Sequence, residues 1–332
     1  MAKRVILAVA GAGKTYHICH EIDPTKRNLI LAFTHENIYN IQKELCDAHG
    51  CVPELTTVST FDSFVYHQLV LPYEPSIAEH FGCPKFVSRG ICTVDPPPQT
   101  IKNSKGKPVA NPLYKKKDRL AHYVTMRGQY YCATLSELVL QVKKNRESLI
   151  KRVAARLNMF YDCVLIDEFQ DFREYDYELI MALAKKLEDV VLVGDYHQHS
   201  VSATNNSGKP FKNKKVEVSY DDFVASIIKE GFTVDVSTLA KSRRCSIDVC
   251  NYVSQKLGIG ITSSGDHTGS VIWVDDAASI LNNNQITKLV FQEAANYSFQ
   301  ALNWSYSKGD TVDSACVILT DGLDNLDSEK FD

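Results

Sequence analysis

The feature that most constrains this chain is a glycine-rich turn near its start. An apolar run at residues 4–9 (RVILAV) has the length and composition of a buried strand, and a helix is predicted from Thr15 to Ile22. The turn between them ends in Gly13-Lys14-Thr15. Small residues allow backbone N–H groups to surround a phosphate at the helix N-terminus, and Lys14 supplies positive charge. The pattern predicts an α/β protein with a phosphate-binding loop.

The turn has the spacing of a Walker A motif, with Ala8 at the position of that motif's first glycine. Small residues fill the loop, namely Gly11, Ala12 and Gly13. Lys14 is expected to contact the β- and γ-phosphates of a nucleoside triphosphate, and the Thr15 hydroxyl to hold Mg²⁺. ATP and Mg²⁺ are thus the predicted ligands.

An acidic motif follows a second apolar run later in the chain. Residues 163–166 (CVLI) predict a buried strand, and Asp167 and Glu168 come directly after it. Asp167 stands where a carboxylate would hold Mg²⁺, and Glu168 where it would polarise the attacking water. The alternative is an acidic turn without a ligand, which is less favourable because clustered carboxylates repel each other in the absence of a cation.

The letters VLIDEFQD resemble motif II of the UvrD/Rep family of superfamily 1 helicases, and further motifs follow in that family's order. They are LAFTHEN at 31–37 (motif Ia), STFDS at 59–63 (Ic), VGDYHQ at 193–198 (III), LAKSRR at 239–244 (IV) and NWSYSKG at 303–309 (V). The resemblance implies two RecA-like lobes with parallel sheets and ATP in the cleft between them. It also implies a DNA helicase or translocase that acts on single-stranded or partly duplex DNA.

The same resemblance implies roles for individual residues. For hydrolysis it gives Gln198 as a γ-phosphate sensor and Arg244 as an arginine finger. For the nucleotide it gives Gly309 and Arg243, which replaces a tyrosine that packs on adenine. For nucleic acid it gives Phe33, whose ring would stack on a base, with Thr34, His35, Thr60, Ser305 and Lys308.

The sequence also departs from that family. His199 and Ser200 follow Gln198 where the family has an aromatic residue and an arginine, and no motif VI occurs before Asp332. The sequence is then either a fragment or impaired in hydrolysis. These departures favour an alternative function, a nucleotide-binding regulatory module that gates a partner effector such as a nuclease. An unrelated P-loop kinase is disfavoured by the order of the motifs.

The order of the elements predicts an interrupted first lobe. The proposed parts are a first RecA-like lobe at 1–71 and 135–203, a proline-rich accessory lobe at 72–134, a linker at 204–215 and an incomplete second lobe at 216–332. From residue 135 to about residue 157 the pattern is again helical. The second lobe is predicted to contain strands at 234–237, 271–274 and 316–319 and helices at 246–257 and 277–289.

Charge is distributed unevenly along the chain, whose net charge is −3. Residues 101–156 contain 14 Lys and Arg against 3 Asp and Glu, and the rest of the chain is acidic. A run of lysines, Lys115, Lys116 and Lys117, lies in this basic insertion. Nucleic-acid phosphates are its expected partner, and a solvated loop is the alternative.

Composition excludes several other classes of protein. Hydrophobic residues make up 44% and charged residues 23%, as in ordinary globular proteins. No apolar run approaches the ~20 residues of a membrane span, and the start of the chain does not resemble a signal peptide. The 10 cysteines lack zinc or redox spacing. A cytoplasmic protein with reduced thiols and no membrane partner is expected.

Overall fold

A computed structural model of the chain describes residues 3–144, 147–199, 208–213, 216–274, 278–307 and 310–319. The chain divides into two compact units. The first unit contains the residues up to Ala8 together with Gly13–Leu239. The second contains the short segment Val9–Ala12 and the residues from Ala240 onward.

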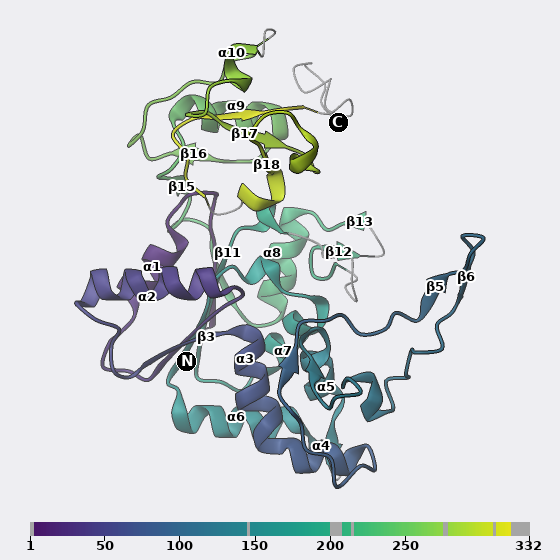
Figure 1. The fold of residues 1–332 in the computed structure, drawn as a ribbon. Helices are drawn as coiled ribbons and strands as arrows, with labels where there is room; N and C mark the ends of the chain where they lie inside the picture. Colours follow the sequence, from purple (N-terminus) through teal and green to yellow (C-terminus); the bar gives the residue numbers. More distant parts are fainter. Residues whose placement is uncertain are drawn as a thin grey trace. The chain divides into compact units, whose positions relative to one another are not determined.

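A six-stranded parallel sheet forms the centre of the first unit, in the order β14-β1-β11-β10-β2-β3 (Figure 1). Its strands are β1 (Lys3–Leu7), β2 (Asn28–Ala32), β3 (Thr56–Thr60), β10 (Cys163–Ile166), β11 (Asp189–Gly194) and β14 (Thr233–Asp235). All five residues of β2 are buried, which explains why its last four residues are apolar without alternation. The α/β class with a parallel sheet is confirmed.

Helices connect these strands, and the first of them is the helix predicted from Thr15 to Ile22. They are α1 (Lys14–Glu21), α2 (His35–His49), α7 (Glu174–Ala184) and α8 (Tyr220–Lys229). The Thr34 hydroxyl caps α2 by accepting a hydrogen bond from Asn37 N at 3.1 Å. The helix ends at Gly50, whose φ of 80° is left-handed and whose N–H donates to Cys46 O at 2.8 Å.

The insertion of the first unit shares the hydrophobic core of the sheet. It begins with α3 (Phe61–Phe64), which continues through further helical turns to α4 (Glu74–His80), and it contains β4 (Ile91–Cys92), β5 (Thr100–Lys102), β6 (Pro108–Ala110) and β7 (Tyr130–Tyr131). Tyr123 and Tyr130 are fully buried here. Their rings therefore pack in the interior and are not exposed surfaces for bases.

The helical character predicted from residue 135 to about residue 157 is confirmed, but it is divided between two helices. Two helices, α5 (Leu135–Gln141) and α6 (Leu149–Phe160), are separated by the short strands β8 (Lys143–Lys144) and β9 (Glu147–Ser148). Val142 takes an extended backbone after α5, and the Ser148 hydroxyl starts α6 by accepting from Ile150 N at 3.3 Å. This cap makes a new helix start more favourable than continuation.

The second unit has a three-stranded parallel sheet in the order β18-β17-β19. Its elements are β15 (Lys241–Ser242), α9 (Ile247–Leu257), β16 (Thr262–Ser263), α10 (Ala278–Leu281), β17 (Thr287–Val290), β18 (Leu302–Asn303) and β19 (Ala315–Val317). The predicted helix at 246–257 corresponds to α9, with Ser246 as its cap. The helix predicted at 277–289 is much shorter because Asn283 begins a turn, its side-chain oxygen accepting from Gln285 N at 3.0 Å.

Two other strand predictions differ from the structure. Residues 271–274 form no strand, and their side chains are between 39% and 73% exposed, because no neighbouring strand pairs with them. The strand predicted at 234–237 is β14, which pairs with β1 and so belongs to the first unit. Residues before 240 thus complete the first sheet, although the second lobe was predicted to start at residue 216.

Among the residues that the structure describes, no helix combines the length and apolar character needed to cross a membrane.

A buried ion-pair network joins three elements around Arg173. Its guanidinium donates to Asp176 at 2.6 Å and to Asp62 at 2.6 Å. The Ser136 hydroxyl also donates to Asp176, whose side chain is 2% exposed. The network links the start of α7 to α3 and α5.

We expect Arg173→Met to lower the free energy of unfolding by about 3–5 kcal/mol, because it leaves a buried carboxylate without its partner. Urea unfolding followed by circular dichroism measures this. Lys151→Ala is the control, since it removes an exposed ion pair with Glu147 and should change stability little. Equal effects of the two substitutions would contradict the assigned role of the network.

Candidate nucleotide-binding site

The glycine-rich turn has the backbone conformation that a phosphate-binding loop needs. Gly13 has a φ of 85° and immediately precedes α1, whose first residue is Lys14. Ala8 N donates to Gly194 O at 2.8 Å, which keeps the end of β1 aligned with β11. The N-terminus of a helix preceded by left-handed glycine is a favourable position for a phosphate group.

Gly11 belongs to the second unit and requires a residue without a side chain. Its φ is 71°, and a Cβ there would lie 2.6 Å from Cβ of Arg244 and 2.9 Å from Oγ of Ser242. Arg243 N donates to Gly11 O at 2.9 Å. In this unit the two arginines predicted to contact the nucleotide therefore lie next to the segment Val9–Ala12.

The loop and the acidic motif, about 150 residues apart in sequence, meet at the carboxyl ends of β1 and β10. The Thr15 hydroxyl donates to Oδ2 of Asp167 at 2.8 Å. Nζ of Lys14 lies 3.2 Å from Oε1 of Glu168. These are the residues that the sequence singles out for the nucleotide, the metal ion and the attacking water, and the structure brings them together.

Asp167 is almost completely buried, with 1% of its surface exposed. Burial raises the pKa of its carboxyl group well above the usual range, and the charge of Glu168 adds to the increase. The Thr15 hydroxyl and the Lys14 ammonium act in the opposite direction without cancelling the effect. A buried carboxylate whose charge is incompletely compensated is well suited to a cation.

The residues present fit Mg²⁺, which prefers carboxylate and hydroxyl oxygens. Within the described residues, no group of three or more His, Cys, Asp and Glu side chains could hold a metal ion. Mg²⁺ usually binds through one or two protein oxygens together with water and substrate phosphates, so Asp167 and Thr15 form an adequate protein contribution.

Glu168 has a strained backbone. Its φ of 53° lies in the left-handed region, which costs a residue other than glycine on the order of 1–3 kcal/mol. Its N–H donates to Oδ1 of Asp167 at 2.9 Å, and this bond helps to hold the conformation. Strain of this kind is characteristic of functional positions, where surrounding contacts fix an unfavourable geometry.

Gln170 is a residue of this site to which sequence reasoning assigned no role. Its side chain is 1% exposed; Nε2 donates to Oε2 of Glu168, and Oε1 accepts a hydrogen bond from Asp195 N at 3.0 Å. Gly194 packs directly against this side chain, because a Cβ at Gly194 would clash with Oε1 of Gln170. Gln170 therefore connects the acidic motif to the segment after β11. Its position within the acidic motif DEFQD is the sequence signal that could have identified it as part of the site.

The segment after β11 also contains the predicted phosphate sensor. Oδ1 of Asp195 accepts from His197 N at 2.9 Å and so starts the short turn that carries Gln198. Because β11 and β10 are adjacent and parallel, Gln198 follows a strand end on the same edge of the sheet as Asp167. The sensor role of Gln198 stays a prediction.

The predicted nucleic-acid contacts of motifs Ia and Ic lie at the ends of β2 and β3. Phe33 is half-buried and packs against Phe61 and Phe172, with ring centroids 5.9 and 5.0 Å away. The Thr34 and Thr60 hydroxyls cap α2 and α3, which gives both residues a structural role. His35 is exposed. Phe33 thus has only part of its ring available for stacking on a base.

The lysines of the predicted run, residues 115–117, differ in their exposure and partners. Lys115 and Lys116 are exposed, whereas Lys117 forms an ion pair with the buried Glu137 and donates to the Tyr175 hydroxyl at 2.9 Å. Burial opposes ionisation of Glu137, but hydrogen bonds from His122 and Lys117 hold its pKa below the usual range. Lys117 therefore anchors the insertion to the body of the first unit.

Three predicted residues of motif V are not placed. Lys308 and Gly309 lie outside the described residues, as does the side chain of Ser305. Half of the predicted linker at 204–215 also lies outside the described residues, whereas residues 208–213 are described and belong to the first unit, with Phe211 buried.

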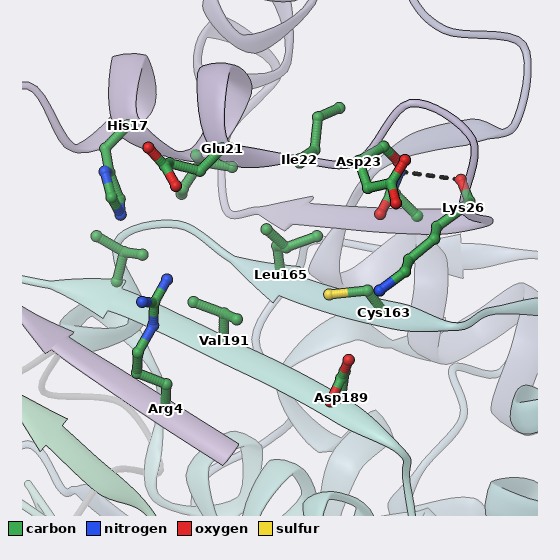
Figure 2. A pocket seen from close by; sticks show the side chains of 13 residues that line it. Arg4, His17, Glu21, Ile22, Asp23, Lys26, Cys163, Leu165, Asp189 and Val191 are labelled. Atoms are coloured by element: carbon green, nitrogen blue, oxygen red, sulfur yellow. Dashed lines mark hydrogen bonds between the residues drawn. The ribbon is translucent and has the colours of Figure 1, made fainter. Parts of the chain in front are cut away.

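A small cavity of about 130 Å³ lies beside α1 (Figure 2). Its lining includes Arg4, Cys163 and Asp189 from the starts of β1, β10 and β11, and His17, whose Nε2 is buried without a hydrogen-bond partner. Ligands of open parallel sheets bind at the carboxyl ends of the strands. This cavity is therefore separate from the nucleotide site.

Comparison with known proteins agrees with this geometry. A profile of the family described as "AAA domain" matches residues 2–204, more than half of the chain. The chain belongs to this AAA domain family. Membership places it among P-loop nucleotide-binding proteins, in agreement with the loop at Gly13 and the carboxylate at Asp167.

One similar solved structure is described as "The structure of PRRSV helicase". The sequence identity is 11% and the TM-score is 0.36, with 96% of this chain and 47% of that chain covered. The AAA domain protein thus spans about half of that chain's length. The search of curated proteins gave no match.

We expect Gln170→Leu to lower ATP turnover by about 10–100-fold while nucleotide affinity changes less than about threefold, because Glu168 loses the group that orients it. Turnover and binding of a fluorescent ATP analogue measure the two effects. Gln141→Leu is the matched control, since Gln141 accepts a hydrogen bond from Tyr123 in the insertion. A loss of turnover as large in the control would show that Gln170 acts only through stability.

Proposed function

We propose that this AAA domain protein is an ATP hydrolase of the UvrD/Rep-like helicase type that moves along single-stranded DNA. The observation that carries this proposal is the pair of contacts from Thr15 to Asp167 and from Lys14 to Glu168. A nucleotide-binding loop and an acidic pair at this distance are the two parts that phosphoryl transfer to water requires. The ordered motifs of the sequence support the helicase type.

The side chains of the site have separable tasks in this proposal. Lys14 would move from Glu168 to the β- and γ-phosphates when ATP arrives, which leaves the Glu168 carboxylate available for a water molecule. Glu168 would then orient that water and accept its proton. When bound, Mg²⁺ neutralises phosphate charge, with Asp167 and Thr15 as its protein ligands. Arg244 would stabilise the charge of the transferring phosphoryl group.

Nucleic acid would bind near the ends of β2 and β3. The exposed His35 and the exposed part of Phe33 support this placement, and the exposed Lys115 and Lys116 of the insertion would add positive charge. Cationic side chains would neutralise backbone phosphates, and an aromatic ring would stack on a base without reading its identity. Ser305 and Lys308 are assigned to the same task by the motif resemblance.

One observation favours the alternative, a nucleotide-gated module that controls a partner effector. His199 stands where related helicases have an aromatic residue that grips DNA. Its ring stacks on Phe211 at 4.6 Å with 4° between the planes, and its side chain is 13% exposed. This side chain packs inward and offers no platform for a base. ATP binding without turnover would then be the signal to the partner.

The decisive measurement is steady-state ATP hydrolysis with and without single-stranded DNA. We expect DNA to raise turnover several-fold, Lys14→Ala to abolish nucleotide binding, and Glu168→Gln to abolish turnover while ATP still binds. Lys43→Ala, an exposed position on α2, is the control. Tight ATP binding with no turnover under any condition would favour the gated module.

A second experiment separates the two arginines of the second unit. We expect Arg244→Ala to reduce kcat by about 10³-fold or more with little change in ATP affinity, as for other arginine fingers. Arg243→Ala should weaken ATP binding and retain most of kcat, since its proposed role is to pack on the base. The opposite pattern, or equal effects on both quantities, would contradict the assignment.

A further inference from the structure

The hairpin formed by β5 and β6 is an antiparallel ribbon. Its register pairs Thr100 with Ala110, Ile101 with Val109 and Lys102 with Pro108. At the tip, Asn103 N donates to Lys107 O at 2.9 Å, and Gly106 has a left-handed φ of 73°. At the base, Asn111 N donates to Gln99 O at 3.0 Å. Hydrogen bonds thus define both ends of the ribbon.

This ribbon contributes nothing to the core of the first unit. All six strand residues are exposed, including the apolar cross-strand pair Ile101 and Val109, at 42% and 38%. Figure 1 shows the ribbon projecting from the body of the first unit. A two-stranded hairpin without further packing is only marginally stable in water. Its exposure and projection are better explained by an external partner than by a role in folding.

The charge of the ribbon identifies the class of partner. Residues 96–117 contain six lysines and no aspartate or glutamate. Lys102, Lys105 and Lys107 lie at the tip, whereas Lys117 is already paired with Glu137 at the far end of the segment. A concentrated positive charge on a projecting element is complementary to a polyanion, of which nucleic acid is the commonest example.

We propose that this ribbon enters the major groove of double-stranded DNA. The groove of B-form DNA is about 12 Å wide and accepts a two-stranded β-ribbon, and phosphates line both of its edges. An RNA duplex has a deep, narrow major groove that side chains cannot reach, and a single strand has no groove. The three lysines at the tip contact phosphates on the two edges. The proposal deepens the proposed function by naming duplex DNA as a second nucleic-acid partner.

Binding by the ribbon depends little on base sequence. Asn103 is the tip side chain best suited to read a base edge, but its oxygen accepts hydrogen bonds from Lys105 N at 3.0 Å and Lys107 N at 2.9 Å. The lysines are flexible point charges that suit phosphate contacts. The ribbon therefore recognises the shape and charge of the duplex.

The test compares a triple variant, K102A/K105A/K107A, with the unmodified chain. Fluorescence anisotropy is measured on a 20-bp DNA duplex, the RNA duplex of the same sequence and single-stranded DNA, over a range of salt concentrations. We expect duplex DNA affinity to fall at least about tenfold at low salt, and the slope of log K against log salt to decrease by up to about 2.7. Affinity for RNA duplex and single strand should change by less than about threefold.

A matched control removes the same charge elsewhere on the first unit. K43A/K186A/K229A substitutes three exposed lysines and should leave duplex affinity within about twofold. Unchanged duplex binding in K102A/K105A/K107A, equal losses on all three nucleic acids, or an equal loss in the control would each overturn the proposal. Loss of binding to anionic lipid vesicles with duplex binding unchanged would identify a membrane partner instead and would also overturn it.

A second variant replaces residues 100–110 with Gly-Ser-Gly, which the close approach of Gln99 and Asn111 permits. We expect the same loss of duplex affinity and a melting temperature within about 2 °C of the unmodified chain, because the ribbon buries no core residue. A large drop in melting temperature would contradict the absence of a folding role and overturn the proposal. The ATP hydrolysis assay uses single-stranded DNA alone, so its failure and failure of this test are distinct results.

Discussion

Burial of a carboxylate beside the phosphate-binding loop is the constraint on which the site depends. Asp167 is almost inaccessible to solvent, and the Thr15 hydroxyl is one of its few hydrogen-bond donors. A buried carboxylate is costly unless it is paired, hydrogen-bonded or bound to a cation. The parallel strands β1, β11 and β10 make the arrangement possible because their carboxyl ends meet at one edge of the sheet. The same edge carries the segment with Gln198.

A second layer of contacts keeps the acidic motif in its strained geometry. Gln170 joins the side chain of Glu168 to the backbone of Asp195, and Gly194 leaves the space that this bridge requires. The bridge therefore connects the side chain of Glu168 to the segment that carries Gln198. Such coupling suits a site in which the attacking water and the γ-phosphate have to be sensed together.

The insertion of the first unit combines anchoring with projection. Buried tyrosines and the pair between Lys117 and Glu137 fix it to the body, whereas the ribbon of β5 and β6 remains outside any core. A rigid attachment is what allows a projecting element to hold a defined position on a large partner. Charge along the sequence indicated a basic surface, but it did not distinguish paired lysines from exposed ones.

The sequence by itself determined the parallel α/β class and the strands β1 and β10 of the first sheet, because buried parallel strands are apolar runs that can be recognised without knowing their partners. It also identified Lys14, Thr15, Asp167 and Glu168, since each follows a strand at a characteristic spacing. It did not show the break between α5 and α6. It also predicted a strand at 271–274 from an apolar run, although in the described structure these residues pair with no strand.

Tertiary structure alone decided the contacts among these residues. The role of Gln170, the partner of Lys117 and the position of β14 next to β1 arise from segments far apart in the sequence. Periodicity reports which face of an element is buried, but it does not report which side chain lies opposite. Hydrogen bonds and ion pairs between distant segments form only when the sheet brings them together, so only the fold could reveal them.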